Sequence, residues 1–164
     1  MEAIDQLDRE AFVARFGPLF EHSPWIAEHA WADRPFDGPD ELYEALCSAM
    51  YAASRERQIE LIRAHPDLAG RAAIAGTLTD DSRREQSAAG LDQLTPDEFE
   101  AFTRVNAAYR ERFGFPFVVC AREHTKESIL RTAAERLEHS QQEELRVALG
   151  EIAKIARLRL QDTL

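Results

Sequence analysis

A chain of 164 residues, 45% of them hydrophobic, has the size of one globular domain and can bury a core without a disulfide or a metal. Its formal net charge of −10, from 30 acidic and 20 basic residues, argues against a nucleic-acid backbone or an anionic membrane as partner. No apolar run approaches the roughly 18 residues of a membrane span and no leader-like segment is visible, so we expect one cytoplasmic domain over residues 1–164.

Helical spacing of the apolar residues begins near the amino-terminal end. Residues 8–20 form an amphipathic pattern, which Gly17 and Pro18 interrupt. Ser23 followed by Pro24 is typical of a capping residue with proline at the first helical position. A second helix is therefore predicted to start at this point.

A longer helical pattern starts at Asp40, and we expect a break near residues 52–55. The pattern ends at His65, because Pro66 lacks a backbone N–H and pushes the preceding residue out of the α region. A short helix over residues 82–90 is predicted to follow the irregular segment after this proline.

The second half of the chain predicts helices on both sides of one extended segment. Thr95 and Glu98 form a capping box, and Gly114 ends the helix that it opens. The apolar stretch near residues 115–121 is extended, but too short and isolated to define a sheet. Two more helices complete the chain, over about residues 126–138 and 141–161. The predicted fold class is all-α, a single compact bundle of about seven to nine helices.

His65 is the first candidate for chemistry. Imidazole is the side chain whose ordinary pKa lies closest to neutrality, so it suits proton transfer. A rigid kink at Pro66 can aim it into a cleft. The alternative is a structural histidine that caps the last carbonyls of its helix.

Arg159 is the second candidate. It follows Ile155 by four residues and Ile152 by seven, so it lies on or beside the apolar face of the last helix. A guanidinium directed at the interior needs an anion or several acceptors. The pattern leaves two alternatives open, a ligand-binding group and a structural residue that forms an ion pair or reaches back to water.

Two segments could offer backbone amides to a ligand. Ser82 and Glu85 have the spacing of a capping box, but the positive start of the same helix also suits an anion, and Glu85 could hold a histidine. The stretch over residues 113–122 has no evident partner strand, so its amides could bind a flat polar heterocycle. The alternative is a buried connector whose amides are satisfied by neighbours.

Other kinds of site are not indicated by the sequence. Cys47 and Cys120 form no CxxC and lie in apolar runs, as buried cysteines do. None of the five histidines belongs to a ligand pair such as HExxH, and glycine-rich nucleotide loops and GxSxG are missing. We therefore expect neither a metal nor a cofactor.

Short segments along nearly the whole chain match one family in order. They are Pro24-Trp25, Arg34-Pro35-Phe36, residues 64–69, Ser82 with Glu85-Gln86, Ala89-Gly90-Leu91, Asn106 with Tyr109, residues 113–122, and residues 151–160. Each segment is weak alone, but the ordered set is specific. In these segments the chain resembles the 2-oxo-4-hydroxy-4-carboxy-5-ureidoimidazoline (OHCU) decarboxylases of urate degradation, without the transthyretin-like domain that some relatives carry.

The resemblance implies a compact helical homodimer without a cofactor that converts OHCU, a small ureide, to (S)-allantoin and CO2. By match to the family, His65 is the catalytic acid/base, and Glu85 and Arg159 complete the polar site. The same match implies substrate contacts at Pro66, Ser82, Arg83, Arg84, Glu85, Gln86, Phe117, Val118, Val119, Cys120 and Ala121.

The chemistry of this reaction suits these residue types. Loss of CO2 leaves an electron pair that the ring can delocalise, so the protein must supply orientation, charge stabilisation and a proton on one face. Glu85 would hold His65 in its charged form, and Arg159 would offer a planar fork to the carboxylate. Two alternatives are a non-enzymatic helical module, with these residues as a structural polar cluster, and an enzyme of the same fold acting on a related ring acid.

Overall fold

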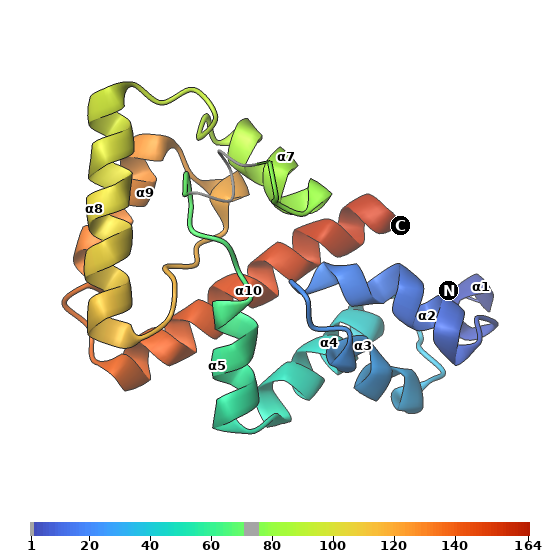
Figure 1. The fold of residues 1–164 in the computed structure, drawn as a ribbon. Coiled ribbons are helices and arrows are strands. Elements are labelled where there is room, and N and C mark those ends of the chain that lie inside the picture. The colour runs from blue at the N-terminus through green and yellow to red at the C-terminus, as the bar shows by residue number, and fades with distance from the viewer. Residues whose placement is uncertain (1, 71–75) are drawn as a thin grey trace. The chain divides into compact units, whose positions relative to one another are not determined.

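The computed structural model describes residues 2–70 and 76–164. Nine α-helices and three 3-10 helices lie in these ranges, which contain no strand, so the all-α prediction is confirmed (Figure 1). Two compact units are present: Met1–Ala64 with Ala153–Leu164, and His65–Ile152. The single domain expected for residues 1–164 stays a prediction. No helix in the described ranges is both long and apolar enough to cross a membrane.

Helices of the first unit begin and end at local signals in the sequence. They are α1 (Glu2–Asp5), α2 (Arg9–Phe16), η1 (Gly17–Leu19), α3 (Trp25–Ala30), η2 (Trp31–Asp33), α4 (Pro39–Ala52) and α5 (Arg55–Arg63). The break predicted near residues 52–55 is confirmed, because Ala53 is extended and Ser54 caps α5 by accepting from the Arg57 amide at 3.2 Å. The predicted cap at Ser23 is wrong: no side chain caps α3, and the Ser23 hydroxyl instead donates to the Glu21 carbonyl at 2.9 Å.

Aromatic side chains and one buried helix pair form the core of the first unit. The ring of Phe12 lies 4.9 Å from Phe16 and 6.2 Å from Phe36, between ring centroids. Burying each such side chain stabilises the fold by roughly 1.5–3 kcal/mol. α3 packs on α4, and the Tyr43 hydroxyl of α4 donates to the Ala153 carbonyl at 2.9 Å, which ties the end of the last helix to this core.

The second unit consists of α7 (Asp80–Ala88), α8 (Pro96–Phe113), η3 (Ala121–Glu123), α9 (Lys126–Arg136) and residues 141–152 of α10 (Gln141–Thr163). Thr95 and Glu98 form the predicted capping box, and Gly114 ends α8 with a left-handed φ of 78°. A capping box between Ser82 and Glu85 was also predicted and is wrong. Thr79 is the cap of α7, because its hydroxyl accepts from the Ser82 amide at 3.2 Å, which places Ser82 inside the first turn.

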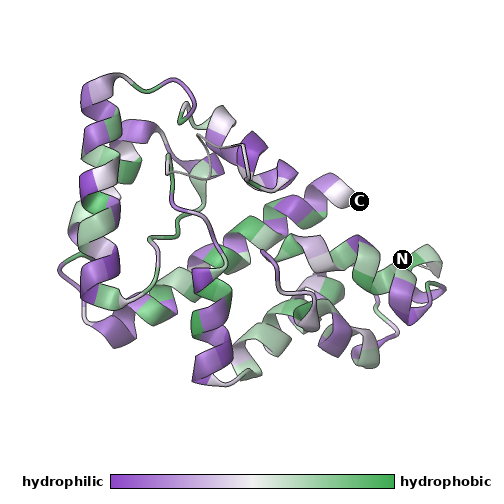
Figure 2. Cartoon of the chain, in the orientation of Figure 1, coloured by the Kyte–Doolittle hydropathy of each residue, from purple (hydrophilic) through white to green (hydrophobic). Residues whose placement is uncertain are grey.

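An aromatic cluster links α8 to the extended segment that follows it. The centroid of the Tyr109 ring is 4.6 Å from that of Phe113 and 5.4 Å from that of Phe117. Residues 115–121 are buried; residues 116–120 lie outside any helix or strand, and Cys120 is extended. Hydrophobic and hydrophilic residues alternate along α8 and α10, as expected of helices with one buried face (Figure 2).

Candidate functional site

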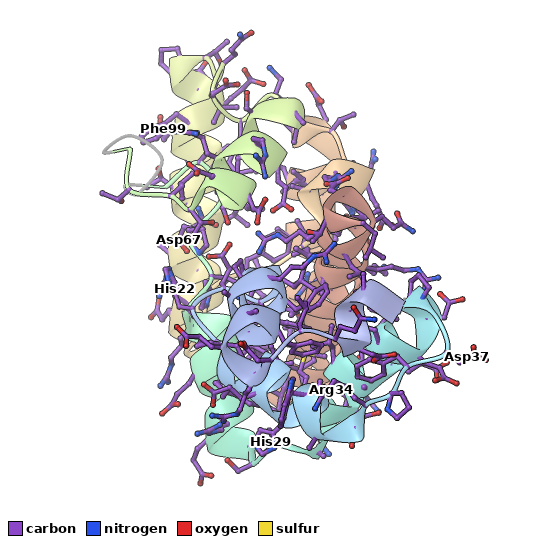
Figure 3. The ribbon with its side chains drawn as sticks, turned by 90° about the vertical axis from the view of Figure 1, so that its right-hand side faces the viewer. His22, His29, Arg34, Asp37, Asp67 and Phe99 are labelled. Atoms are coloured by element: carbon purple, nitrogen blue, oxygen red, sulfur yellow. The ribbon has the colours of Figure 1, made fainter. Side chains whose placement is uncertain are left out.

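His65 follows Ala64, the C-cap of α5, and its side chain is buried in the second unit. The loop over residues 65–70, on which Figure 3 labels Asp67, then leads away from the helix. Pro66 is partly buried beside it. A buried imidazole between a helix end and a proline has little freedom, so its direction depends on how this loop is held.

Side chains from two helices of the same unit hold the loop. Gln86 of α7 accepts from the Ala69 amide at 3.0 Å and donates to the Asp67 carbonyl at 3.4 Å. Asn106 of α8 donates to the Leu68 carbonyl at 3.0 Å, while its buried Oδ1 meets no hydrogen-bond partner in the described ranges. Ala69 has a left-handed φ of 55°, a backbone conformation that is unfavourable for residues with a Cβ. α7 and α8 therefore define the backbone path next to His65.

Glu85 directly precedes Gln86 and is partly buried on α7, which packs against η3. Its charge acts on the neighbouring Cys120 thiol. Burial, followed by the charges of Glu123, Glu151 and Glu85, raises the pKa of Cys120 to about 11. The structure thus brings Glu85 close to the predicted substrate segment over residues 117–121.

The backbone of residues 117–121 is partly engaged by side chains. The Val118 carbonyl accepts from Arg136 at 2.6 Å, and the Cys120 amide donates to Glu151 at 3.4 Å. Within the part of the chain that the structure describes, the amides of Val118 and Val119 find no acceptor. The segment is thus buried, and ligand binding by the amides of Val118 and Val119 stays a prediction.

A buried polar cluster behind this segment was missed in the sequence. The Glu144 carboxylate is fully buried and accepts hydrogen bonds from the Tyr109 hydroxyl at 2.6 Å and from Arg136 Nε at 2.5 Å. Its other oxygen lies 2.8 Å from Nδ1 of His139. Burial, and next the hydrogen bond to Glu144, raise the pKa of the Tyr109 hydroxyl. The sequence does contain a signal for this cluster, a charged residue on an apolar helix face, because Arg136 follows Ala133 by three residues on the buried face of α9.

Arg159 belongs to the first unit, where it meets a carboxylate that the sequence did not indicate. Its Nη2 donates to Glu21 Oε1 at 2.9 Å, and its Nη1 donates to the Pro18 carbonyl at 3.4 Å. The two charged side chains are only 4% and 1% exposed. The ion pair anticipated as one alternative is present, and Glu21 could not be found by periodicity because it lies in a turn.

The remaining predicted residues lie on α7. Ser82 is buried, whereas Arg83 and Arg84 are exposed and pair with Asp80 and Asp81 on the same helix. Exposed pairs of this kind are worth little, about 0–1 kcal/mol. Both guanidinium groups therefore remain accessible to a solvated anion at low energetic cost.

A cavity of about 970 Å³ adjoins α7, and its walls combine apolar side chains with several polar ones. Arg83, Arg84 and Gln86 line it together with apolar side chains such as Leu91 and Phe99. Of these, Figure 3 labels Phe99. Neither His65 nor Glu85 belongs to its lining in the described ranges. No group of three or more histidine, cysteine, aspartate or glutamate side chains able to hold a metal ion occurs there either.

Known proteins match the chain over almost its whole length. The sequence model of a family described as OHCU decarboxylase matches residues 5–161. Proteins named 2-oxo-4-hydroxy-4-carboxy-5-ureidoimidazoline decarboxylase are similar: one from Haloferax volcanii is 45% identical over 98% of this chain and 93% of its own length. One from Mus musculus is 44% identical over 100% and 92%.

Solved structures agree on the fold. A crystal structure of (S)-allantoin synthase superposes with a TM-score of 0.80 at 28% identity, over 99% of this chain, which spans 53% of that protein. A crystal structure of OHCU decarboxylase in the presence of (S)-allantoin superposes with a TM-score of 0.72 at 22% identity, over 95% of this chain and 97% of the other. At that identity the second match supports the helical fold alone.

Proposed function

The chain belongs to the OHCU decarboxylase family, and from this membership we propose that it is a carboxy-lyase that converts OHCU to (S)-allantoin and CO2 in urate degradation. The match over residues 5–161, together with relatives of the same name covered over more than nine-tenths of their length, is the observation that carries the proposal. The ligand is then a small ureide. A cytoplasmic homodimer that works without a cofactor is part of the same proposal.

His65 is the proton donor in this proposal. As the bond to the carboxylate breaks, its electron pair stays on the ring carbon and spreads into the adjacent imine-like and carbonyl groups. CO2 leaves, and the His65 imidazolium delivers a proton to the adjacent, ureido-bearing ring carbon. The hydroxyl proton passes to the ring nitrogen, and the hydroxyl oxygen becomes a carbonyl of allantoin. A donor held on one face explains a single enantiomer, and the loop contacts from Gln86 and Asn106 support such a fixed position.

Glu85 favours the charged form of His65 in the proposed site, because a carboxylate stabilises a neighbouring imidazolium. Its place on α7, one residue before the side chain that holds the His65 loop, supports this role. The amides of Val118 and Val119 would bind the polar edge of the ring. Ser82 and Gln86 would bind the ureido arm, and Gln86 also holds the loop of His65.

Arg159 binds the substrate carboxylate in this proposal, because a planar guanidinium presents a fork of donors that matches a carboxylate. Its burial supports the role, since hydrogen bonds to charged groups are stronger away from water. Arg83 and Arg84, which are exposed, would contribute only attraction of the anionic substrate to this face of α7.

The chirality of the product tests the proposal. OHCU decays spontaneously to racemic allantoin, so circular dichroism of the product during the reaction reveals a catalyst that imposes one hand. We expect the protein to give (S)-allantoin, and His65→Asn to lose roughly 10²- to 10⁴-fold in rate. His29→Asn, at an exposed histidine, is the matched control and should behave like the parent. Racemic product at the spontaneous rate with the parent protein would refute the function, and a folded, fully active His65→Asn would refute the role of His65.

A further inference from the structure

The turn between η1 and α3 directs a carboxylate into the first unit. The Ser23 hydroxyl donates to the Glu21 carbonyl at 2.9 Å, and the Ser23 amide donates to the Phe20 carbonyl at 3.4 Å. His22, at the centre of the turn, has a left-handed φ of 47°. Its side chain is 69% exposed, whereas that of Glu21 is 1% exposed. The strained turn therefore buries the carboxylate and leaves most of the imidazole exposed, while His22 Nε2 still lies 3.9 Å from Glu21 Oε2.

The buried carboxylate of Glu21 meets Arg159 at 2.9 Å, and Pro18 on the same stretch of chain offers its carbonyl to the same guanidinium. A buried ion pair is expensive to desolvate and is weak evidence for stability alone. Its electrostatic consequence is that the charge of Glu21 offsets the charge of Arg159. Arg157, two residues earlier on α10, differs: it is half exposed and pairs with the exposed Asp40 at 3.5 Å.

We infer that Glu21 is a positioning residue for decarboxylation, which orients the Arg159 guanidinium and cancels its charge. The inference rests on the role proposed for Arg159. A carboxylate loses its negative charge as CO2 departs, so an unbalanced cation beside it would stabilise the bound substrate more than the transition state. A guanidinium that is already paired holds the carboxylate through directional hydrogen bonds and avoids this excess stabilisation.

Glu21→Gln gives this inference a signature that a purely structural residue lacks. The amide keeps the size and one acceptor but removes the charge, so Arg159 becomes a net cation. We expect KM for OHCU and kcat to fall severalfold together, because the ground state gains an attraction that the transition state lacks. Glu21→Asp keeps the charge but shortens the side chain by one methylene. It should retain the KM of the parent while kcat falls, because the guanidinium is displaced.

The experiment measures kcat and KM per folded molecule for the parent, both Glu21 variants, Arg159→Lys and the control Asp40→Asn, which should match the parent. If Glu21→Gln does not fold, Glu21→Asp decides the question alone. Parent-like kcat in Glu21→Asp, or an unchanged or raised KM in a folded Glu21→Gln, overturns the inference while an active parent and an impaired Arg159→Lys uphold the proposed function. An inactive parent instead overturns the function itself.

Discussion

The buried carboxylate of Glu144 allows a stability prediction that can be worked from the structure. Its side chain is 0% exposed, and it accepts from Tyr109, Arg136 and His139 within 2.5–2.8 Å. In Glu144→Gln the amide offers one acceptor oxygen and presents its NH2 group to neighbours that are themselves donors. The positive charge of Arg136, only 5% exposed, would lose its counter-charge.

Removing one partner of a buried pair costs about 3–5 kcal/mol. For a chain of this size each kcal/mol corresponds to about 2–4 °C, so the melting temperature should fall by roughly 6–20 °C. Urea and thermal unfolding followed by far-UV circular dichroism measure both quantities. Glu100→Gln is the matched control, because the pair of Glu100 with Arg104 is 70% and 75% exposed and should be worth at most about 1 kcal/mol. Equal stability losses in the two variants would refute the reasoning.

Two further predictions concern single side chains. Arg159→Lys should lower kcat/KM at least about tenfold, because the ammonium group cannot replace the two parallel donors of a guanidinium. A lost hydrogen bond to a charged group is worth about 1.5–3 kcal/mol. Parent-like values in steady-state kinetics would contradict this prediction. Cys120 has a pKa raised to about 11, chiefly by burial, so at pH 8 iodoacetamide should label it far more slowly in folded than in urea-unfolded protein, as followed by mass spectrometry. Because the raised pKa favours the protonated thiol, its contribution to stability is present below pH 9 and is lost as the pH rises toward 11, which alkaline unfolding should detect.

Helix limits were predictable from the sequence wherever the signal is local. Thr95 with Glu98 and Gly114 act through neighbours within a few residues, and the structure has both ends of α8 as predicted. Ser23 and Ser82 failed for a common reason. Serine is a suitable capping residue, but another group competes at each place. The Ser23 hydroxyl donates to the Glu21 carbonyl instead of capping α3, and Thr79 caps α7 one turn before Ser82.

Partners of buried charges were harder to predict because they depend on contacts between distant segments. Arg159 stood out as a cation on an apolar helix face, yet its partner Glu21 lies 138 residues away in a turn without periodicity. Glu144 and Arg136 are only eight residues apart, but they lie on different helices, so helical spacing does not relate them. A buried charge can therefore be recognised in a sequence, whereas the choice between an ion pair and a ligand needs coordinates.

Several departures from local preference lie at the groups to which we assign function, although the buried Nε1 of Trp31, which also meets no hydrogen-bond partner in the described ranges, does not. In the described ranges the non-glycine residues with positive φ are His22, in the turn that directs Glu21 inward, and Ala69, in the loop that begins at His65. The orphaned Oδ1 of Asn106 belongs to a side chain that holds this same loop. A left-handed residue costs roughly 1–2 kcal/mol, and a buried unsatisfied acceptor about 1–3 kcal/mol. Packing alone gives no reason to keep such strain at these two places, whereas aiming a carboxylate and an imidazole does.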